Sequence, residues 1–350
     1  YFPGKQSWLH ILPAVGLSYG SVFFISGILF ITFSNSFVLI NSLLATLFFV
    51  GDFIRRNRHL PNMAYIPHGR AGSAAQIPHA NWICLNAPEL PQTPVQAVVA
   101  DLHCPDLSAD WQRFLAACTL DGIPVYNIRQ IEESLTGRVK IRHLYENDLG
   151  SLLPPAGYML VKRLLDILCV LAALPFALPL MLLTAIAIRL ESAGSVLFVQ
   201  NRVGQGGREF KIYKFRSMRT DSEQNGAQLA QVGDSRITRV GSFIRKTRLD
   251  ELPQFFNILK GDMSLIGPRP EQKVFVEQFE KSIPFYQYRH IVKPGLSGWA
   301  QVTQGYAGNT DETQVKIEHD FYYIKHFSFS LDVLIMFKTV KIILTGFGAR

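Results

Sequence analysis

The stretch KRLLDILCVLAALPFALPLMLLTAIAIRLE, Lys162 to Glu191, decides what kind of fold this chain can adopt. It carries no charge between Ile167 and Ile188 and is long enough to cross the roughly 30 Å of hydrocarbon in a bilayer. Pro175 and Pro179 fall in its middle, and each proline removes a helical hydrogen bond and bends the helix. The residues alone leave two topologies open: a kinked helix that crosses the membrane, and a broken helix that enters and returns on one side.

A second apolar region lies near the start of the chain, where no side chain is charged from Ile11 to Gly51. The polar triplet Ser34-Asn35-Ser36 divides this region, and the basic run Arg55-Arg56-Asn57-Arg58 follows it. We predict a hairpin of two transmembrane helices within residues 1–61. By the positive-inside rule, the basic run places the remainder of the chain in the cytosol.

The overall composition agrees with membrane contact, because 48% of the residues are hydrophobic and only 18% are charged. The net charge of +8 suits nucleic acid, an anionic membrane face or phosphorylated substrates. The chain has neither zinc-finger spacing nor an RNA-binding aromatic signature, so we expect no nucleic-acid partner. Its four cysteines form no CxxC pair, which argues against a disulfide framework.

Residues 62–150 have the character of a small α/β domain. Short apolar runs alternate with loops and with one expected helix, Ala109 to Leu120, which predicts a parallel, Rossmann-like sheet. Gly69-Arg70-Ala71-Gly72 follows the first strand, where a dinucleotide-binding loop would lie. It lacks the leading glycines of GxGxxG, and no acidic residue closes the second strand. We therefore interpret this domain as vestigial, a regulatory or structural spacer.

Two β-rich runs follow the central apolar stretch and enclose a glycine-rich turn, which predicts a hairpin over residues 195–218. The second run carries Lys211, Lys214 and Arg216 on both of its faces. These cations suit anionic lipid or, together with Arg202, a diphosphate.

The pair Asp250-Glu251 is the strongest chemical signal in the chain. It follows Arg245, Lys246 and Arg248 within a segment that predicts one amphipathic helix from Ser242 to Leu259. An isolated acidic pair is usually a solvated helix face, but here Pro268-Arg269-Pro270 follows shortly after. We expect the arginines to favour an ionised aspartate, which could attack phosphorus while its neighbour helps to hold a divalent cation.

From Lys162 to about Phe347 the chain resembles the bacterial sugar transferase family, the monotopic polyprenyl-phosphate phosphoglycosyl transferases. The match covers just over half of the chain. It rests on motifs in a fixed order: Lys162-Arg163 with Asp166; Gln200-Asn201-Arg202 with Gly204; the run Lys211 to Met218; Leu249-Asp250-Glu251-Leu252-Pro253-Gln254; Lys260 to Ser264 leading into Gly267-Pro268-Arg269-Pro270; the run Lys293 to Val302; and Asp320 with Tyr322-Tyr323.

The resemblance implies an α/β membrane protein of the large form of this family. Its parts would be a transmembrane hairpin (1–61), a Rossmann-like domain (62–150) and a catalytic domain (151–350). A re-entrant helix at about 160–190, broken at Pro179, would keep the catalytic domain on the cytosolic face of the bacterial inner membrane. The family's break is a Ser-Pro, whereas this chain has Leu178-Pro179. The segment from Phe327 to Leu344 would be an interfacial amphipathic helix.

The implied activity transfers a sugar 1-phosphate from a UDP-sugar to polyprenyl (undecaprenyl) phosphate and releases UMP. Asp250 would form an aspartyl-phosphosugar intermediate, and Asp250 with Glu251 would bind Mg²⁺. This is the first membrane step of bacterial surface glycan assembly, so later glycosyltransferases are expected functional partners, and a homodimer is compatible. The competing hypotheses are a non-catalytic, membrane-tethered nucleotide-binding regulator and a glycosyltransferase that releases UDP.

The resemblance also implies a set of substrate- or phosphate-binding residues: Arg269, Lys214, Arg202, Arg216, Pro268, Pro270, Lys293, Gly295 and Gln301. The segment from Lys293 to Val302 either shapes the uridine or phosphate end of the site or forms a turn anchored by Trp299. Asp320, Tyr322 and Tyr323 either reach the sugar or the membrane interface or have structural roles.

Overall fold

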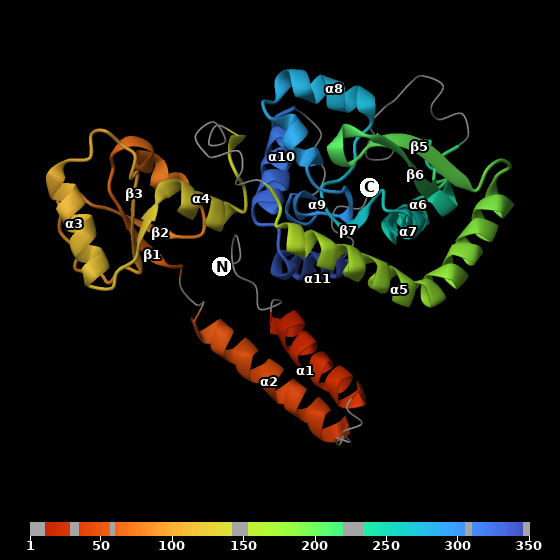
Figure 1. Cartoon of the computed structure of the whole chain (residues 1–350), viewed down its shortest axis with the longest axis horizontal. Coiled ribbons are helices and arrows are strands. Elements are labelled where there is room, and N and C mark those ends of the chain that lie inside the picture. Colours follow the sequence, from red (N-terminus) through yellow and green to blue (C-terminus); the bar gives the residue numbers. More distant parts are fainter. Residues whose placement is uncertain are drawn as a thin grey trace. The chain divides into compact units, whose positions relative to one another are not determined.

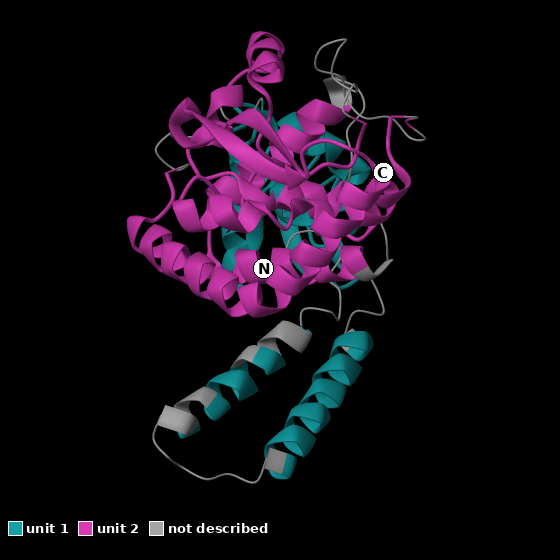
Figure 2. Cartoon of the chain, turned by 90° about the vertical axis from the view of Figure 1, so that its right-hand side faces the viewer, with its two compact units in different colours: residues 1–143 teal, residues 144–350 magenta. Residues whose placement is uncertain are grey.

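The computed structural model describes residues 11–28, 35–56, 60–141, 153–219, 234, 236–304 and 310–345. The chain divides into two compact units, residues 1–143 and 144–350 (Figure 2). The predicted division into three parts with boundaries near 61 and 150 stays a prediction. The mixed α/β character of the chain is confirmed.

The N-terminal hairpin is described as two helices, α1 (Ile11–Ile28) and α2 (Asn35–Arg56), which lie against each other. The predicted turn between them lies largely outside the described residues. By length and composition, two helices in the described part of the chain could cross a membrane: Ser36–Arg55 within α2, and α5. Most large apolar side chains of α2 are exposed, as in Phe37 and Phe48.

The small domain of the first unit contains four parallel strands, β1 (Asn62–Tyr65), β2 (Asn81–Cys84), β3 (Ala97–Ala100) and β4 (Val125–Asn127), in the order β2-β1-β3-β4 (Figure 1). Its central strand, β3, is buried throughout because both faces of the sheet are covered. Helix α3 (Ala109–Leu120) packs on one face; η2 (Gly69–Gln76) and α4 (Ile128–Thr136) cover the other.

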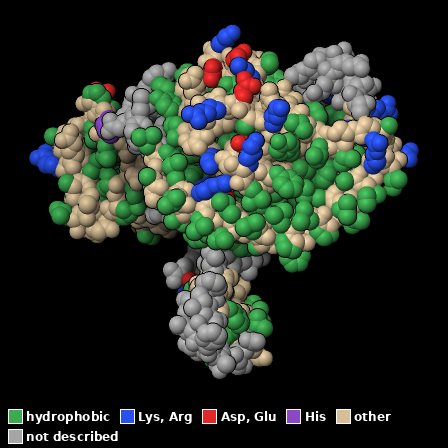
Figure 3. Space-filling view, turned by 45° about the vertical axis from the view of Figure 1, so that its right-hand side comes forward, with side chains coloured by type: hydrophobic (Ala, Val, Ile, Leu, Met, Phe, Trp, Pro, Cys, Tyr) green, Lys and Arg blue, Asp and Glu red, His purple; other side chains and the backbone are tan. Residues whose placement is uncertain are grey.

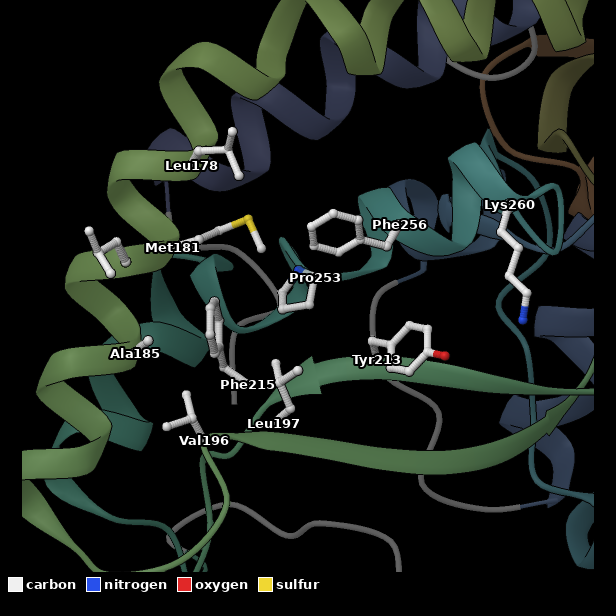
Figure 4. Close-up of a pocket in the computed structure, with 11 residues that line it drawn as sticks. Leu178, Met181, Ala185, Val196, Leu197, Tyr213, Phe215, Pro253, Phe256 and Lys260 are labelled. Atoms are coloured by element: carbon white, nitrogen blue, oxygen red, sulfur yellow. The ribbon is translucent and has the colours of Figure 1, made fainter.

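The second unit is built on α5 (Ala156–Glu191), a helix of 36 residues with both prolines inside it. A straight helix of this length would span about 54 Å, well beyond the roughly 30 Å of a bilayer's hydrocarbon. Instead α5 changes direction about midway (Figure 1), and Leu178 lies at the bend (Figure 4). Just past Pro179, the hydroxyl of Thr184 donates to the carbonyl of Leu180 at 2.7 Å, a side-chain bond of the kind that bends helices.

Three charged residues of the sequence motif at the start of α5 fix this helix to the rest of its unit. The ammonium of Lys162 donates to a carboxylate oxygen of Asp332 at 2.6 Å. Arg163 donates to the last carbonyls of α7 (Gln254–Lys260), which a helix end leaves without internal partners. Asp166 accepts the backbone N–H of Leu265 at 3.1 Å. The motif is therefore an anchor for the membrane-compatible helix.

The outward face of α5 remains apolar and uncovered. Its exposed side chains include Leu160, Phe176 and Leu190, which expose 76, 78 and 82% of their surface. Figure 3 shows many hydrophobic side chains of this unit gathered on one face. A contiguous exposed apolar face of this kind is typical of a membrane-contacting surface.

The predicted hairpin is confirmed as β5 (Leu197–Val203) paired antiparallel with β6 (Glu209–Phe215), around the short turn η5 (Gln205–Gly207). The single helix predicted over 242–259 is wrong. The segment forms α6 (Arg239–Lys246), a one-turn 3₁₀ helix η6 (Leu249–Glu251) and α7. The break comes at Arg248, which takes a left-handed conformation, whereas Leu252 and Pro253 keep right-handed helical angles where η6 passes into α7.

The remaining elements surround this centre. Strand β7 (Ser264–Ile266) pairs parallel with β8 (Gly295–Ser297), which brings the loop after each strand to the same edge. The helices are α8 (Lys273–Ser282), η7 (Tyr286–His290), α9 (Trp299–Thr303), α10 (Thr310–Lys325) and α11 (Phe329–Thr345). Leu331, Leu334 and Ile335 of α11 are buried, whereas Met336 and Val340 are exposed, so α11 presents an apolar side to solvent as well as to the core.

Candidate active site

The acidic pair lies on η6, a turn that begins with unusual backbone geometry. Arg248, immediately before it, has φ +60° and ψ +16°, a left-handed conformation that costs a residue with a side chain roughly 1–2 kcal/mol. Non-glycine residues held in this way concentrate at functional sites, because the surrounding structure must maintain them. The turn directs Asp250 and Glu251 away from a continuous helix and toward β6 and the loop after β7.

Glu251 is buried and is held by three cations. Its Oε1 lies 3.0 Å from Nη2 of Arg269 and 3.7 Å from Nζ of Lys214, and its Oε2 lies 4.0 Å from Nη1 of Arg248. Burial by itself would raise the pKa of Glu251. The charges of Arg269, Lys214 and Arg248 outweigh that effect and lower the pKa to about 2. Glu251 is therefore ionised at neutral pH and orients the cations around it.

The pKa of Asp250 is shifted in the opposite direction. Burial, followed by repulsion from Glu251, raises its pKa to about 6, although Lys214, Arg269 and Arg245 act in the other direction. Arg269 and Arg245 favour the ionised aspartate, as expected, but burial outweighs them. Among the described residues, Oδ1 of Asp250 is buried without a hydrogen-bond partner. A carboxylate oxygen that has no hydrogen-bond partner in the described structure and lies near cations is suited to attack an electrophilic atom.

Lys214 comes to the pair from β6. Burial and the neighbouring charge of Arg269 lower its pKa to about 8, although Glu251 acts against this. The structure thus brings together four of the predicted residues, Asp250, Glu251, Lys214 and Arg269, from β6, η6 and the loop after β7.

The Arg269 loop is fixed from behind by a buried cluster. One guanidinium nitrogen of Arg289, in η7, donates hydrogen bonds to the backbone carbonyl of Arg269 and to Oδ2 of Asp320, both at 2.8 Å. Its other terminal nitrogen donates to the hydroxyl of Tyr286 at 2.8 Å. Both side chains of the ion pair are only 2% exposed. This cluster, which we call the Arg289 clamp, determines where the Arg269 backbone sits.

Arg202 holds the next residue of the same loop. Its guanidinium donates to the carbonyl of Pro270 at 3.3 Å and to the side chain of Gln200 at 2.8 Å, and it lies 3.6 Å from Glu271. Lys316 pairs with Glu271 from the other side. In the structure Arg202 therefore positions the loop.

Glycine is required where this loop meets β8. A side-chain carbon on Gly295 would lie 2.1 Å from the backbone nitrogen of Gly267, and one on Gly298 would lie 2.3 Å from its carbonyl oxygen. The Gly295 N–H donates to the carbonyl of Pro268 at 3.0 Å. Gln301 lies beside this contact, and within the described part of the chain its Oε1 is buried without a partner.

The structure does not bring Arg216 or Lys293 to the acidic pair. Arg216 lies just past the end of β6, and its guanidinium donates to the carbonyls of Ser192 and Ala193, which follow the end of α5. It is a structural cap there. The ammonium of Lys293 lies near Arg163 at the end of α7, and burial followed by the Arg163 charge lowers its pKa.

The C-terminal candidates are also structural. Asp320 is buried in the Arg289 clamp, and the hydroxyl of Tyr323 donates to Asp332 at 2.7 Å. Tyr322 packs against the rings of Trp299 and His326. The alternative in which these side chains reach the sugar or the membrane interface does not fit their burial.

Sequence reasoning missed three organising residues. Asn257 is completely buried and joins α7 to the edge of β6, accepting the N–H of Tyr213 at 3.0 Å and donating to the carbonyl of Lys211 at 2.7 Å. Arg289 and Asp332 have no local signal, because their partners lie far away along the chain. The one clue in the sequence was Asn257 itself, a polar residue within an apolar run that follows the acidic pair.

The acidic pair is also the candidate metal site. Within the described ranges, no three His, Cys, Asp or Glu side chains lie close enough to hold a metal ion among themselves. Mg²⁺ is usually bound by one or two carboxylates together with substrate phosphates and water. The adjacent carboxylates of Asp250 and Glu251, one of which has an oxygen without a partner among the described residues, fit that kind of donor set.

A buried acidic pair of unequal acidity, surrounded by cations in the unit that contains a membrane-compatible helix, indicates the class: a membrane-associated enzyme that acts on phosphorylated groups. The comparison with known proteins then identifies the family. Residues 157–346 match the model of the bacterial sugar transferases, and the chain belongs to that family.

Three relatives illustrate the range of similarity. The UDP-N-acetylgalactosamine-undecaprenyl-phosphate N-acetylgalactosaminephosphotransferase of Aeromonas hydrophila is 56% identical over 100% of this chain and 83% of its own length. The UDP-glucose:undecaprenyl-phosphate glucose-1-phosphate transferase of Xanthomonas campestris pv. campestris is 45% identical over 52% of this chain and 38% of its own length. An exopolysaccharide production protein of Rhizobium leguminosarum bv. phaseoli is 41% identical over 52% of this chain and 94% of its own length.

Proposed function

We propose that this protein transfers a sugar 1-phosphate from a UDP-sugar to polyprenyl phosphate and releases UMP. The observation that carries the proposal is the buried Asp250 carboxylate, whose Oδ1 has no partner in the described structure while Glu251 engages the surrounding cations. The Aeromonas relative, similar over the whole chain, supports UDP-N-acetylgalactosamine as the donor and undecaprenyl phosphate as the acceptor.

The first half of the reaction is a displacement at phosphorus. Oδ1 of Asp250 attacks the β-phosphorus of the UDP-sugar, and the bond from that phosphorus to the bridging oxygen breaks. The oxygen leaves with the electron pair as part of UMP, and Asp250 carries the phosphosugar as an acyl phosphate. No proton has to move, provided that Asp250 is ionised.

In the second half, a phosphate oxygen of the lipid acceptor attacks the same phosphorus. The bond to Asp250 breaks, the carboxylate is regenerated, and the product is a polyprenyl diphosphosugar. Splitting the transfer suits two substrates that arrive in turn from water and from the membrane.

The cations stabilise the negative charge that gathers at phosphorus. Arg269 lies between two prolines and is held at its carbonyl by Arg289, so ordering its guanidinium for phosphate costs little additional entropy. Lys214 offers a second positive charge to the same place. Mg²⁺, held by Asp250 and Glu251, would neutralise charge on the diphosphate.

The pKa values predict a bell-shaped pH profile for adduct formation. Asp250, with its pKa raised to about 6, must lose its proton to attack, so the rate should fall about tenfold per pH unit below that value. Lys214, with its pKa lowered to about 8, must keep its proton to bind phosphate, so the rate should also fall above pH 8. Single-turnover rates between about pH 5 and about pH 9 measure both limbs.

The Lys214→Arg variant serves as the control for this profile. Because arginine stays protonated in the whole range, the alkaline limb should disappear while the acidic limb remains. A wild-type profile that is flat around pH 6 would contradict the assignment of Asp250.

Intact-protein mass spectrometry tests the proposed function directly. Purified protein mixed with Mg²⁺ and UDP-N-acetylgalactosamine, without lipid, should gain the mass of one phosphosugar, mapped by peptide analysis to Asp250. UDP-glucose and UDP-galactose, tested in parallel, identify the preferred sugar. Release of UDP in place of UMP would establish the competing glycosyltransferase chemistry, and turnover with lipid but no adduct would establish direct transfer.

The membrane arrangement belongs to the same proposal. A re-entrant α5, bent near Pro179, would keep the catalytic unit on the cytosolic face of the inner membrane, where UDP-sugars are made. The bend of α5 and its exposed apolar face support this topology. Later glycosyltransferases would extend the lipid-linked product, and a homodimer is compatible with this arrangement.

The small α/β domain would act as a spacer or regulator without binding a dinucleotide. The carboxylate of Asp101 lies where a phosphate would have to sit at the start of η2, accepting the backbone N–H groups of Arg70 at 3.1 Å and His103 at 3.3 Å. A side-chain carbon on Gly69 would lie 2.8 Å from the same carboxylate. A negative charge in this position repels a pyrophosphate.

A further inference from the structure

A large apolar pocket lies beside the acidic pair. It has a volume of about 670 Å³ and is bounded by the second half of α5, the β5–β6 hairpin and α7 from Pro253, just before it, to its last residue, Lys260 (Figure 4). Of its eleven lining residues, only Tyr213 and Lys260 have polar groups in their side chains. Ligand sites in proteins are typically about 300–1,000 Å³ and mostly apolar, so the pocket has the size and lining of a site for a hydrocarbon ligand.

The pocket is reached from the membrane-compatible side of the protein. Leu178 and Leu182 of α5 line it and are also 49% and 63% exposed. They therefore belong both to the pocket wall and to the outward apolar face of the helix that is long and apolar enough to enter a bilayer. A hydrocarbon chain lying against this face would meet apolar side chains of α5 at the pocket.

The pocket also shares its structural elements with the proposed catalytic cluster. Pro253, in its wall, is separated from Glu251 by a single residue. Tyr213 and Phe215, which also line it, flank Lys214, whose ammonium lies 3.7 Å from Glu251. Because side chains alternate along a strand, Tyr213 and Phe215 face the pocket while Lys214 faces the acidic pair from the other side of β6.

One side of the pocket is polar. Figure 4 shows the hydroxyl of Tyr213 directed toward the side on which the Lys260 ammonium lies. Lys260 is 64% exposed in its side chain, with the carboxylate of Asp262 at 3.7 Å. An apolar cavity with a cation and a hydroxyl at one side matches a hydrocarbon chain that ends in an anion.

We propose that this pocket binds the first isoprene units of the polyprenyl phosphate acceptor. The inference rests on the proposed function, because it assigns a place to the acceptor of that reaction. The chain moves from the hydrocarbon of the bilayer to protein of similar polarity, so burial contributes little to affinity. The pocket acts mainly by holding the chain next to η6, the turn that carries the acidic pair.

The test fills the pocket from α5 and reads the two half-reactions separately. Ala185 lines the pocket, and Ala185→Trp places a large ring in it. We expect kcat/KM for polyprenyl phosphate to fall about tenfold or more, while adduct formation from UDP-N-acetylgalactosamine without lipid keeps its wild-type rate. Ala172→Trp is the matched control, because Ala172 is exposed on the same helix and does not line the pocket; it should change neither half-reaction.

A second measurement uses the wild-type protein in phosphatidylglycerol vesicles, with a polyprenyl phosphate that carries a photoreactive group on its first isoprene unit. We expect crosslinks at Met181 or Phe256, both of which line the pocket, and competition by unlabelled polyprenyl phosphate. This measurement decides the question if the Ala185→Trp variant does not fold.

The outcomes separate the inference from the proposed function. Unchanged kcat/KM in a folded Ala185→Trp variant, or crosslinks confined to other helices, overturns the assignment of the pocket. Labelling of the pocket that unlabelled acceptor does not reduce identifies it as a site for bulk phospholipid, which also overturns the assignment. Absence of both adduct and transfer in the wild type refutes the proposed function itself, and the inference with it.

Discussion

Replacing Asp250 with asparagine is expected to lower the transfer of phosphosugar to lipid about 10⁴-fold and to abolish the covalent adduct. An amide is a far poorer nucleophile than a carboxylate, and Oδ1 of Asp250 is the unpaired acidic oxygen at the centre of the described site. UMP release and mass spectrometry of the protein after mixing with donor measure the two effects. Asp121→Asn, an exposed aspartate of the other unit, is the matched control and should retain full activity.

The same substitution should leave the fold intact or make it more stable. Burial and Glu251 raise the pKa of Asp250 to about 6, so the stability gained from its protonated form is complete below its unfolded pKa near 4 and is lost as the pH rises through 6. The neutral amide avoids this loss, and the free energy of unfolding at neutral pH should rise by about 1–3 kcal/mol. Thermal denaturation in detergent at about pH 5 and about pH 7.5 measures the difference. Transfer within tenfold of wild type would refute the nucleophile assignment.

The second large effect is expected at the Arg289 clamp. Replacing Asp320 with alanine removes the carboxylate that lies 2.8 Å from Arg289, in a pair whose side chains are only 2% exposed. The buried guanidinium loses its counter-charge, which should lower the free energy of unfolding by about 3–5 kcal/mol. Chemical denaturation measures this change. Glu209→Ala, which breaks the exposed pair with Lys273, is the control and should cost no more than about 1 kcal/mol.

A double substitution separates stability from catalysis at the clamp. Combining Arg289→Met with Asp320→Leu replaces the ion pair by apolar side chains and should restore most of the lost stability. Transfer should stay about 100-fold below wild type, because the carbonyl of Arg269 no longer has its donor and the Arg269 loop loses its position. If the double variant regains both stability and activity, the clamp does not position Arg269.

Features that depend on neighbouring residues could be predicted. The apolar length of α5 and its two prolines indicated a bent, membrane-compatible helix, and the alternation around a glycine-rich turn predicted the β5–β6 hairpin. The acidic pair and the Pro-Arg-Pro loop were expected to lie together, and the 3.0 Å ion pair between Glu251 and Arg269 joins them.

Features that depend on distant partners could not be predicted. The helix expected over 242–259 is interrupted because Arg248 takes a left-handed conformation that local propensity does not foresee. Arg216 was expected to bind phosphate, yet the free carbonyls after α5 engage it. The arginines were expected to favour an ionised Asp250, and Arg269 and Arg245 do so, but burial, which only the packed structure determines, outweighs them and raises the pKa to about 6.

The sequence by itself determined which segments can enter a membrane and which residue types carry the chemistry, because hydrocarbon length, proline bends and charge patterns are local properties. Only the tertiary structure decided the roles of those residues. It assigned the cations to Glu251, left an oxygen of Asp250 without a partner among the described residues, and supplied Arg289 and Asn257 from elsewhere in the chain to hold the site. The physical reason is that burial and charge pairing arise when segments distant in sequence pack together.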